Sequence, residues 1–163
     1  VLQSLTTFTL DLSGRDNVGD VELTGMAQGL GALQNLATIS LNFQRCPNVG
    51  DAGFTGFAQG LRVLQNLTTI TINFCWCKKV GDAGLTGLAQ GLGALQKLTQ
   101  IDLNFSGCDN VGAVGLSDLA QGLGVLQSLT TFTLDLSGRD NVGDVELTGM
   151  AQGLGALIWP RSL

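Results

Sequence analysis

The chain has 163 residues, of which 44% are hydrophobic and 13% charged, and its net charge at pH 7 is −5. Only 8 residues are Lys or Arg, which argues against nucleic-acid binding, because that binding depends on clustered cations that meet phosphates. The absence of histidine excludes Ser/His and Cys/His nucleophiles and histidine-based metal sites, and no apolar run approaches the roughly 18 residues of a membrane-spanning helix.

The chain is a series of related units, each 31 residues long. The units begin at Leu2, Leu33, Leu64, Leu95 and Leu126. They predict five repeats and a divergent end, with boundaries 2–32, 33–63, 64–94, 95–125, 126–156 and 157–163. Residues 1–32 are identical to residues 125–156. A fixed period of this size predicts a solenoid, in which each repeat contacts only its neighbours.

Each repeat opens with a predicted strand, in which apolar residues alternate with polar ones, as in 5–12. Alternation places every second side chain on the same face of a sheet. Stacking then aligns the inward side chains in columns, of which the first is Phe8, Ile39, Ile70, Ile101 and Phe132, and the second is Leu10, Leu41, Ile72, Leu103 and Leu134.

A polar loop and a predicted helix complete each repeat. We interpret the aspartate column as helix N-caps, because a carboxylate there accepts backbone N–H bonds; its members are Asp20, Asp51, Asp82 and Asp144, with Ala113 in the fourth repeat. The spacing of Leu23, Met26, Ala27 and Leu30 predicts a helix with one buried face. Glycines inside these helices cost about 0.5–1 kcal/mol each, so stacking must hold the helices.

A strand, a helix and a return to a parallel strand predict a right-handed β–α superhelix. Helices need about 10 Å of width, whereas parallel strands lie about 4.8 Å apart. The stack must therefore curve. The expected fold class is α/β, with a parallel sheet on the concave side and the helices on the convex side.

The repeat also resembles a known family. Residues 67–72, LTTITI, resemble the LxxLxL opening of leucine-rich repeats, and residues 77–89 are similar to the cysteine-containing, ribonuclease-inhibitor-like branch. The resemblance extends over residues 1–156, but each unit has two additional residues before the cysteine, and Arg15 and Arg139 replace it in the first and last repeats. The resemblance implies protein–protein recognition, usually on the concave surface.

The cysteines are the remaining candidates for chemistry. Cys46, Cys77 and Cys108 share one column, and we favour buried structural thiols, with a disulfide between neighbours or a metal-binding thiolate pair at Cys75 and Cys77 as alternatives. No phosphate-binding loop or catalytic carboxylate pair is evident. We therefore expect no catalytic residue, cofactor or metal site, no enzyme activity, and an intracellular, reducing compartment, most simply the cytoplasm.

The repeats differ most in the loops just beyond the predicted strands. A tryptophan beside two lysines in the third repeat is the best candidate for a binding hot spot, and the alternative is that this ring packs over the adjacent loop. The predicted partner-binding residues come from these loops and from the exposed strand face: Arg45, Trp76, Lys78, Lys79, Thr69, Thr71, Asn73 and Asn104.

The leading hypothesis is a non-enzymatic protein-interaction or scaffold module, such as an accessory subunit of a larger assembly. The alternative is a binder of a repetitive surface, ice or polysaccharide, through Thr-x-Thr columns on the concave sheet, although threonine is also a common strand former. We interpret Ile158 and Trp159 as a rudimentary lid. No cap precedes Val1, so we expect further repeats before it or end-to-end contacts at the N-terminal face.

Overall fold

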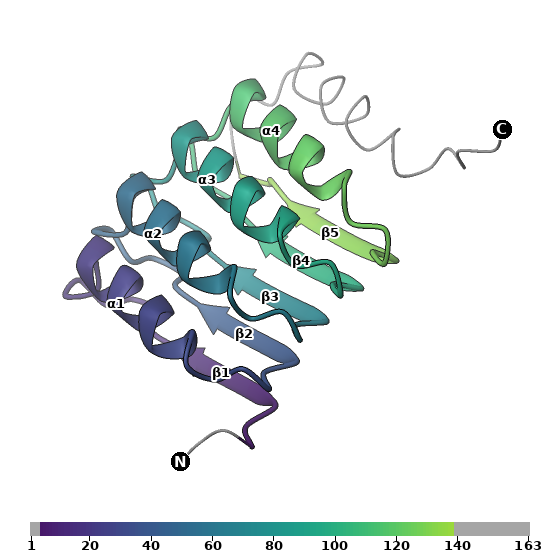
Figure 1. The fold of residues 1–163 in the computed structure, drawn as a ribbon. Helices are drawn as coiled ribbons and strands as arrows, with labels where there is room; N and C mark the ends of the chain where they lie inside the picture. Colours follow the sequence, from purple (N-terminus) through teal and green to yellow (C-terminus); the bar gives the residue numbers. More distant parts are fainter. Residues whose placement is uncertain (1–3, 139–163) are drawn as a thin grey trace, which may run out of the picture.

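The computed structural model describes residues 4–138 of the chain. This part forms one sheet of five parallel strands in sequence order, and helices cover one face of the sheet (Figure 1). The strands are β1 (Thr7–Asp11), β2 (Thr38–Asn42), β3 (Thr69–Asn73), β4 (Gln100–Asn104) and β5 (Thr131–Asp135). The helices are α1 (Asp20–Leu30), α2 (Asp51–Leu61), α3 (Asp82–Gly93) and α4 (Ala113–Leu123).

This arrangement confirms the predicted α/β leucine-rich repeat solenoid, with a concave parallel sheet and convex helices. Residues beyond 138, which include most of the fifth predicted repeat, Arg139 and the predicted lid at Ile158 and Trp159, lie outside the described residues. None of the described helices is long and apolar enough to cross a membrane.

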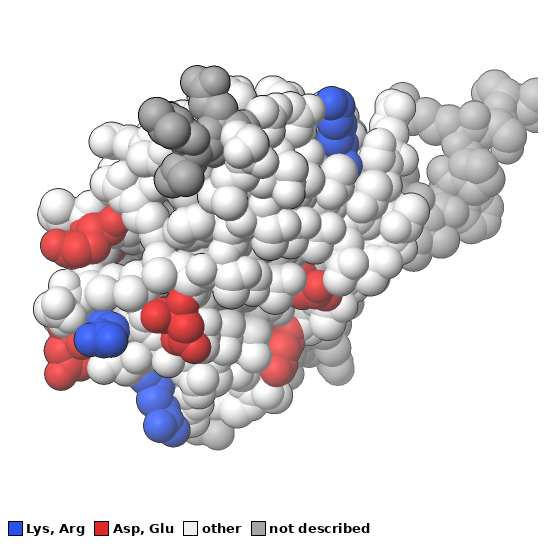
Figure 2. All heavy atoms as spheres, turned by 90° about the horizontal axis from the view of Figure 1, so that it is seen from below, with Lys and Arg blue, Asp and Glu red and all other residues white. Residues whose placement is uncertain are grey.

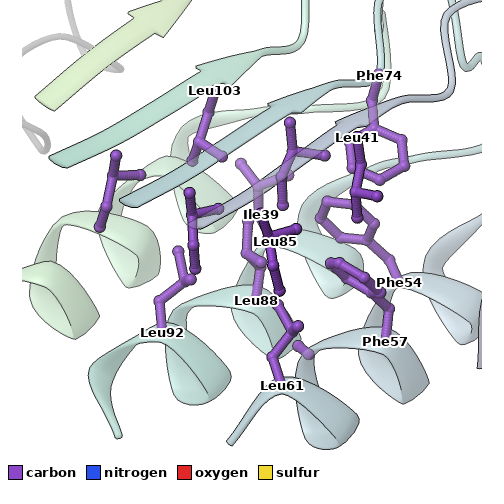
Figure 3. Close-up of a cluster of buried hydrophobic side chains, with 14 of the residues drawn as sticks. Ile39, Leu41, Phe54, Phe57, Leu61, Phe74, Leu85, Leu88, Leu92 and Leu103 are labelled. Carbon is purple, nitrogen blue, oxygen red and sulfur yellow. The ribbon is translucent and has the colours of Figure 1, made fainter. Parts of the chain in front are cut away.

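The strands pair in the register that the repeat predicts. Thr38 pairs with Thr69 and Ile39 with Ile70, so each residue lies beside its equivalent in the next repeat. The alternate residues of β2, β3 and β4 point toward the helices, and Ile39, Ile70 and Ile101 are completely buried. Side chains of the strands and of the helices meet in one continuous apolar layer (Figure 3).

A row of phenylalanine rings closes this layer at the carboxyl ends of the strands. Phe74 stacks on Phe43 with ring centroids 5.1 Å apart and on Phe105 with centroids 6.0 Å apart. Phe54 of α2 meets Phe74 edge-on, with centroids 4.4 Å apart. The rings therefore join three successive repeats to each other and to a helix.

Glycines on α2 to α4 allow each helix to lie directly on the helix before it. A Cβ atom built at Gly60 would lie 2.6 Å from the Cβ atom of Ala27, and one at Gly91 would lie 2.6 Å from the carbonyl oxygen of Ala58. No other residue type fits at these distances. Glycine thus lowers the intrinsic stability of each helix but permits close packing between repeats.

The aspartates at the helix starts have a different role from the one predicted. α2, α3 and α4 are each preceded by a glycine at the N-cap position, and no side chain caps these helices there. The Asp20 carboxylate instead accepts the backbone N–H of Gly50 in the next repeat, at 2.7 Å. Asp51 and Asp82 accept from the equivalent glycines of the third and fourth repeats at 2.7 and 2.6 Å.

The N-cap interpretation was therefore wrong for the described repeats. Because each aspartate is the first residue inside its helix, rather than the residue before it, its carboxylate bonds to the neighbouring repeat. The aspartate column therefore connects neighbouring repeats and does not cap the helix starts.

Candidate functional site

The candidate site begins at the turn that follows each strand. One residue of every turn has a left-handed backbone, with φ between +58° and +68°; these residues are Gly14, Arg45, Trp76, Gly107 and Gly138. The backbone N–H of this residue donates a hydrogen bond to the next repeat. Arg45 donates to the Cys75 carbonyl at 2.8 Å, and Trp76 donates to the Ser106 carbonyl at 2.9 Å. Glycine adopts this conformation freely, whereas other residues pay about 1–2 kcal/mol.

Trp76 both packs on the adjacent loop and remains accessible. A Cβ atom at Gly107 would lie 3.0 Å from the indole ring, so the ring covers this glycine of the fourth repeat. The Lys78 ammonium lies 4.3 Å from the ring centroid, within cation–π range. Even so, 46% of Trp76 is exposed. Trp76 therefore packs over the adjacent loop, as one of the two interpretations expected, and keeps the exposure that the binding hot-spot hypothesis requires.

The three cationic side chains near Trp76 differ in how they are paired. Lys78 forms a salt bridge with Asp109 at 2.5 Å, and Lys79 donates a hydrogen bond to the Asn48 side chain at 2.8 Å. Arg45 is exposed, and its guanidinium has no ion pair within residues 4–138. We call Arg45, Trp76 and Lys78 the turn surface. Arg45 and Trp76 occupy the same position in successive repeats.

The predicted residues on the open face of the sheet have mainly structural contacts. The side-chain oxygen of Asn73 accepts the N–H of Cys75, and that of Asn104 accepts the N–H of Ser106, both at 2.9 Å. Thr69 and Thr71 are half-buried in β3. The asparagine column thus ends the strands and shapes the turns that carry the turn surface.

The threonine columns are interrupted in the fourth repeat. Asp102 stands in the column of Thr71 and accepts a hydrogen bond from Gln100 at 2.7 Å, while the Thr71 hydroxyl lies 3.5 Å from the same carboxylate. A charged, internally bonded group in the middle of the sheet breaks the regular lattice that a repetitive ligand requires. The ice- or polysaccharide-binding alternative is therefore not favoured.

The ends of β1 and β5 carry aspartates in place of these asparagines. Hydrogen bonds from the backbone and side chain of Ser13 are the main reason that the pKa of Asp11 lies below its usual value. The same bonds from Ser137 lower the pKa of Asp135. Asn42 adds a bond to Asp11 at 3.1 Å. The Asp/Asn column is therefore a turn-forming element in each repeat.

All four cysteines are buried free thiols, which agrees with the structural role favoured from the sequence. Cys46, Cys77 and Cys108 each donate a hydrogen bond, 3.1 Å long, to a backbone carbonyl of the preceding repeat. Burial raises the pKa of the Cys77 thiol to about 12. Cys75 accepts a hydrogen bond from the Ser106 hydroxyl at 2.9 Å. Within residues 4–138, no three potential metal ligands cluster.

We expect Cys77 to resist alkylation in the folded protein. The reactive species is the thiolate, and a thiol with a pKa of about 12 is almost entirely protonated at pH 8. Iodoacetamide labelling followed by peptide mass spectrometry should find Cys77 unmodified without denaturant and fully modified in urea. Equal labelling rates in the two conditions would contradict the burial of this thiol.

The left-handed turn was not predicted from the sequence, although a signal was present. Gly14, Gly107 and Gly138 align with Arg45 and Trp76, and three glycines in one column indicate a position that favours positive φ. The pairing of Lys78 with Asp109 was also missed; these two residues are 31 apart and so are neighbours in the stack.

No family description and no curated protein sequence matches this chain. Solved structures of similar fold include the following two. The tropomodulin C-terminal domain of Caenorhabditis elegans has a TM-score of 0.63 and 9% identity, over 96% of this chain and 86% of that one. Leiomodin-1 actin-binding site 2 has a TM-score of 0.64 and 12% identity, over 92% and 80%. At these identities the likeness supports the solenoid fold alone.

Proposed function

We propose that this protein is a non-enzymatic protein-interaction module that binds its partner through the turn surface of Arg45, Trp76 and Lys78. The observation that carries the proposal is the left-handed backbone of Arg45 and Trp76. Three other repeats place glycine at this position and make the same turn. Backbone strain that a glycine would relieve is characteristic of functional positions.

The two strained positions carry the residue types that dominate protein interfaces. Tryptophan and arginine are enriched among binding hot spots, where each contributes 2 kcal/mol or more. This gain exceeds the strain of about 1–2 kcal/mol at each position. Both side chains are exposed, and Gly107 supports one face of the Trp76 ring. A rigid aromatic group beside a cation that has no ion pair in the described part of the chain is well suited to an interface.

The charges of the turn surface define the chemistry of the partner. Asp109 neutralises Lys78, whereas Arg45 is left without an ion pair among the described residues. The partner should therefore offer a carboxylate to Arg45 and an apolar group to the exposed half of Trp76. Because one structure of similar fold is described as an actin-binding site, actin is the first protein to test.

Several expectations from the sequence belong to the same proposal. A scaffold or accessory-subunit role would use the turn surface to dock in a larger assembly. The net charge of −5 supports a protein partner over a nucleic acid. The four buried thiols support a reducing compartment such as the cytoplasm, and the carbonyl-bonded cysteine column supports kinship with the ribonuclease-inhibitor-like branch.

The test compares the wild-type protein with the double variant Arg45→Gly, Trp76→Gly. Glycine keeps the turn and removes both side chains, so the fold should persist. We expect the wild-type protein to retain its partner in co-sedimentation with actin filaments or in capture from an extract of the source organism, and the double variant to lose it at least tenfold. Partners retained equally by both proteins would show that binding lies elsewhere.

We expect Arg45→Gly to be more stable than Arg45→Ala by about 1 kcal/mol, because only glycine relieves the left-handed strain. Both variants lack the guanidinium, so they should weaken partner binding to the same extent. Urea denaturation measures the stability difference. Equal stabilities would indicate that the turn relaxes without cost, which would remove the main support for the proposed site.

A further inference from the structure

The outer face of the first repeat has no neighbour within residues 4–138. Among the described strands, β1 pairs only with β2, and Phe8 and Leu10 are half-buried. A Cβ atom at Gly25 or Gly29 of α1 would meet no atom within 4 Å, whereas the equivalent glycines of α2 pack on α1. Figure 2 shows the molecule from below, the side on which β1 lies in Figure 1, and most of that surface is uncharged.

This face matches the surface that each later repeat presents to the repeat before it, with one exception. Glu22 occupies the position of Gly53, Gly84 and Gly115. A Cβ atom at Gly53 would lie 2.5 Å from the Cα atom of Asp20, and the distance from Gly84 to the Asp51 carboxylate would be 2.7 Å. A glutamate at this position leaves no room for a preceding repeat that carries the aspartate, and it brings two carboxylates together.

Glu22 also takes the hydrogen-bonding role that an aspartate of the preceding repeat has at the later helices. The backbone N–H of Gly19 donates to the Glu22 carboxylate at 3.0 Å. In the next repeat, the equivalent N–H of Gly50 donates to Asp20 of the repeat before it. The first repeat therefore satisfies this N–H with a side chain of its own, as the glutamate of a capping box does.

Glutamate replaces the glycine of this position in one other repeat. The only two glutamates of the chain are Glu22 and Glu146, which are equivalent positions of the first and fifth repeats. Glu146, outside the described residues, follows the one repeat in which Ala113 replaces the aspartate. Two pairings thus occur: aspartate is followed by glycine in the next repeat, and alanine is followed by glutamate.

We propose that this pair of positions decides which repeat stacks on which: an aspartate at the helix start requires glycine at this position of the next repeat, and Glu22 excludes a neighbour that carries that aspartate. A helix that begins with this aspartate, as α1, α2 and α3 do, would set its carboxylate against Glu22 if it packed on the outer face of α1. The two pairings therefore do not mix.

A double-mutant cycle at the first junction tests the pairing rule in the full chain. The variants are Asp20→Ala, Gly53→Glu, and both together, which recreates the Ala113–Glu146 pair. We expect Gly53→Glu to lower the melting temperature most and the double variant to melt above Gly53→Glu. If the melting temperature of the double variant lies below that of Gly53→Glu by the full decrease that Asp20→Ala causes alone, the two sites act independently. That result would overturn the pairing rule.

Discussion

Phe74→Ala should reduce the free energy of unfolding by about 3–5 kcal/mol, the range for a buried phenylalanine whose cavity cannot collapse. Phe74 is fully buried and contacts the rings of Phe43, Phe54 and Phe105. The substitution removes ring contacts to the repeats on both sides. Because each repeat contacts only its neighbours, losing these contacts in the third repeat weakens the coupling between the two halves of the described stack.

The chain provides a matched control for this variant. Leu12 and Leu136 occupy the same column in the first and fifth repeats, so leucine is compatible with the backbone there. Phe74→Leu should cost less than half as much as Phe74→Ala, because it retains most of the buried volume. Urea denaturation followed by circular dichroism measures both. A loss below about 1 kcal/mol for Phe74→Ala would contradict the role of the ring row in stability.

The regular part of the fold was predictable because its physical cause is local. Alternation in the strand and the spacing of Leu23, Ala27 and Leu30 in the helix each identify a buried face from one repeat alone. The period of 31 then aligns equivalent residues, as the pairing of Ile70 with Ile101 shows. Repetition supplies the long-range contacts that a single sequence does not normally reveal.

The candidate site was less predictable because it depends on backbone conformation and on the exact helix start. Trp76 was identified from residue type and position, but its left-handed φ is a property of the turn. The role of Asp20 changes from a cap to a contact between repeats when the helix begins one residue earlier. Such a difference lies within the uncertainty of helix boundaries derived from sequence.

Gly60→Ala should destabilise the protein by about 3 kcal/mol, whereas the same change at the equivalent Gly29 should stabilise it by about 0.5–1 kcal/mol. A methyl group at Gly60 would lie 2.6 Å from the Ala27 Cβ atom and 2.8 Å from its carbonyl carbon, so α1 and α2 must separate. Backbone atoms cannot move aside as a flexible side chain would. A methyl group at Gly29 would meet no atom of the other described segments within 4 Å, so alanine contributes only its higher helix propensity.

Thermal or urea unfolding of the two single variants shows whether each substitution raises or lowers the stability of the protein. The opposite effects come from position in the stack alone, because Gly29 and Gly60 occupy the same place in consecutive repeats. A stabilising Gly60→Ala would show that the helices are more loosely packed than the structure indicates. A destabilising Gly29→Ala would show that a second copy or another segment already covers the outer face of α1, and sedimentation of that variant beside the wild type separates these two occupants by mass.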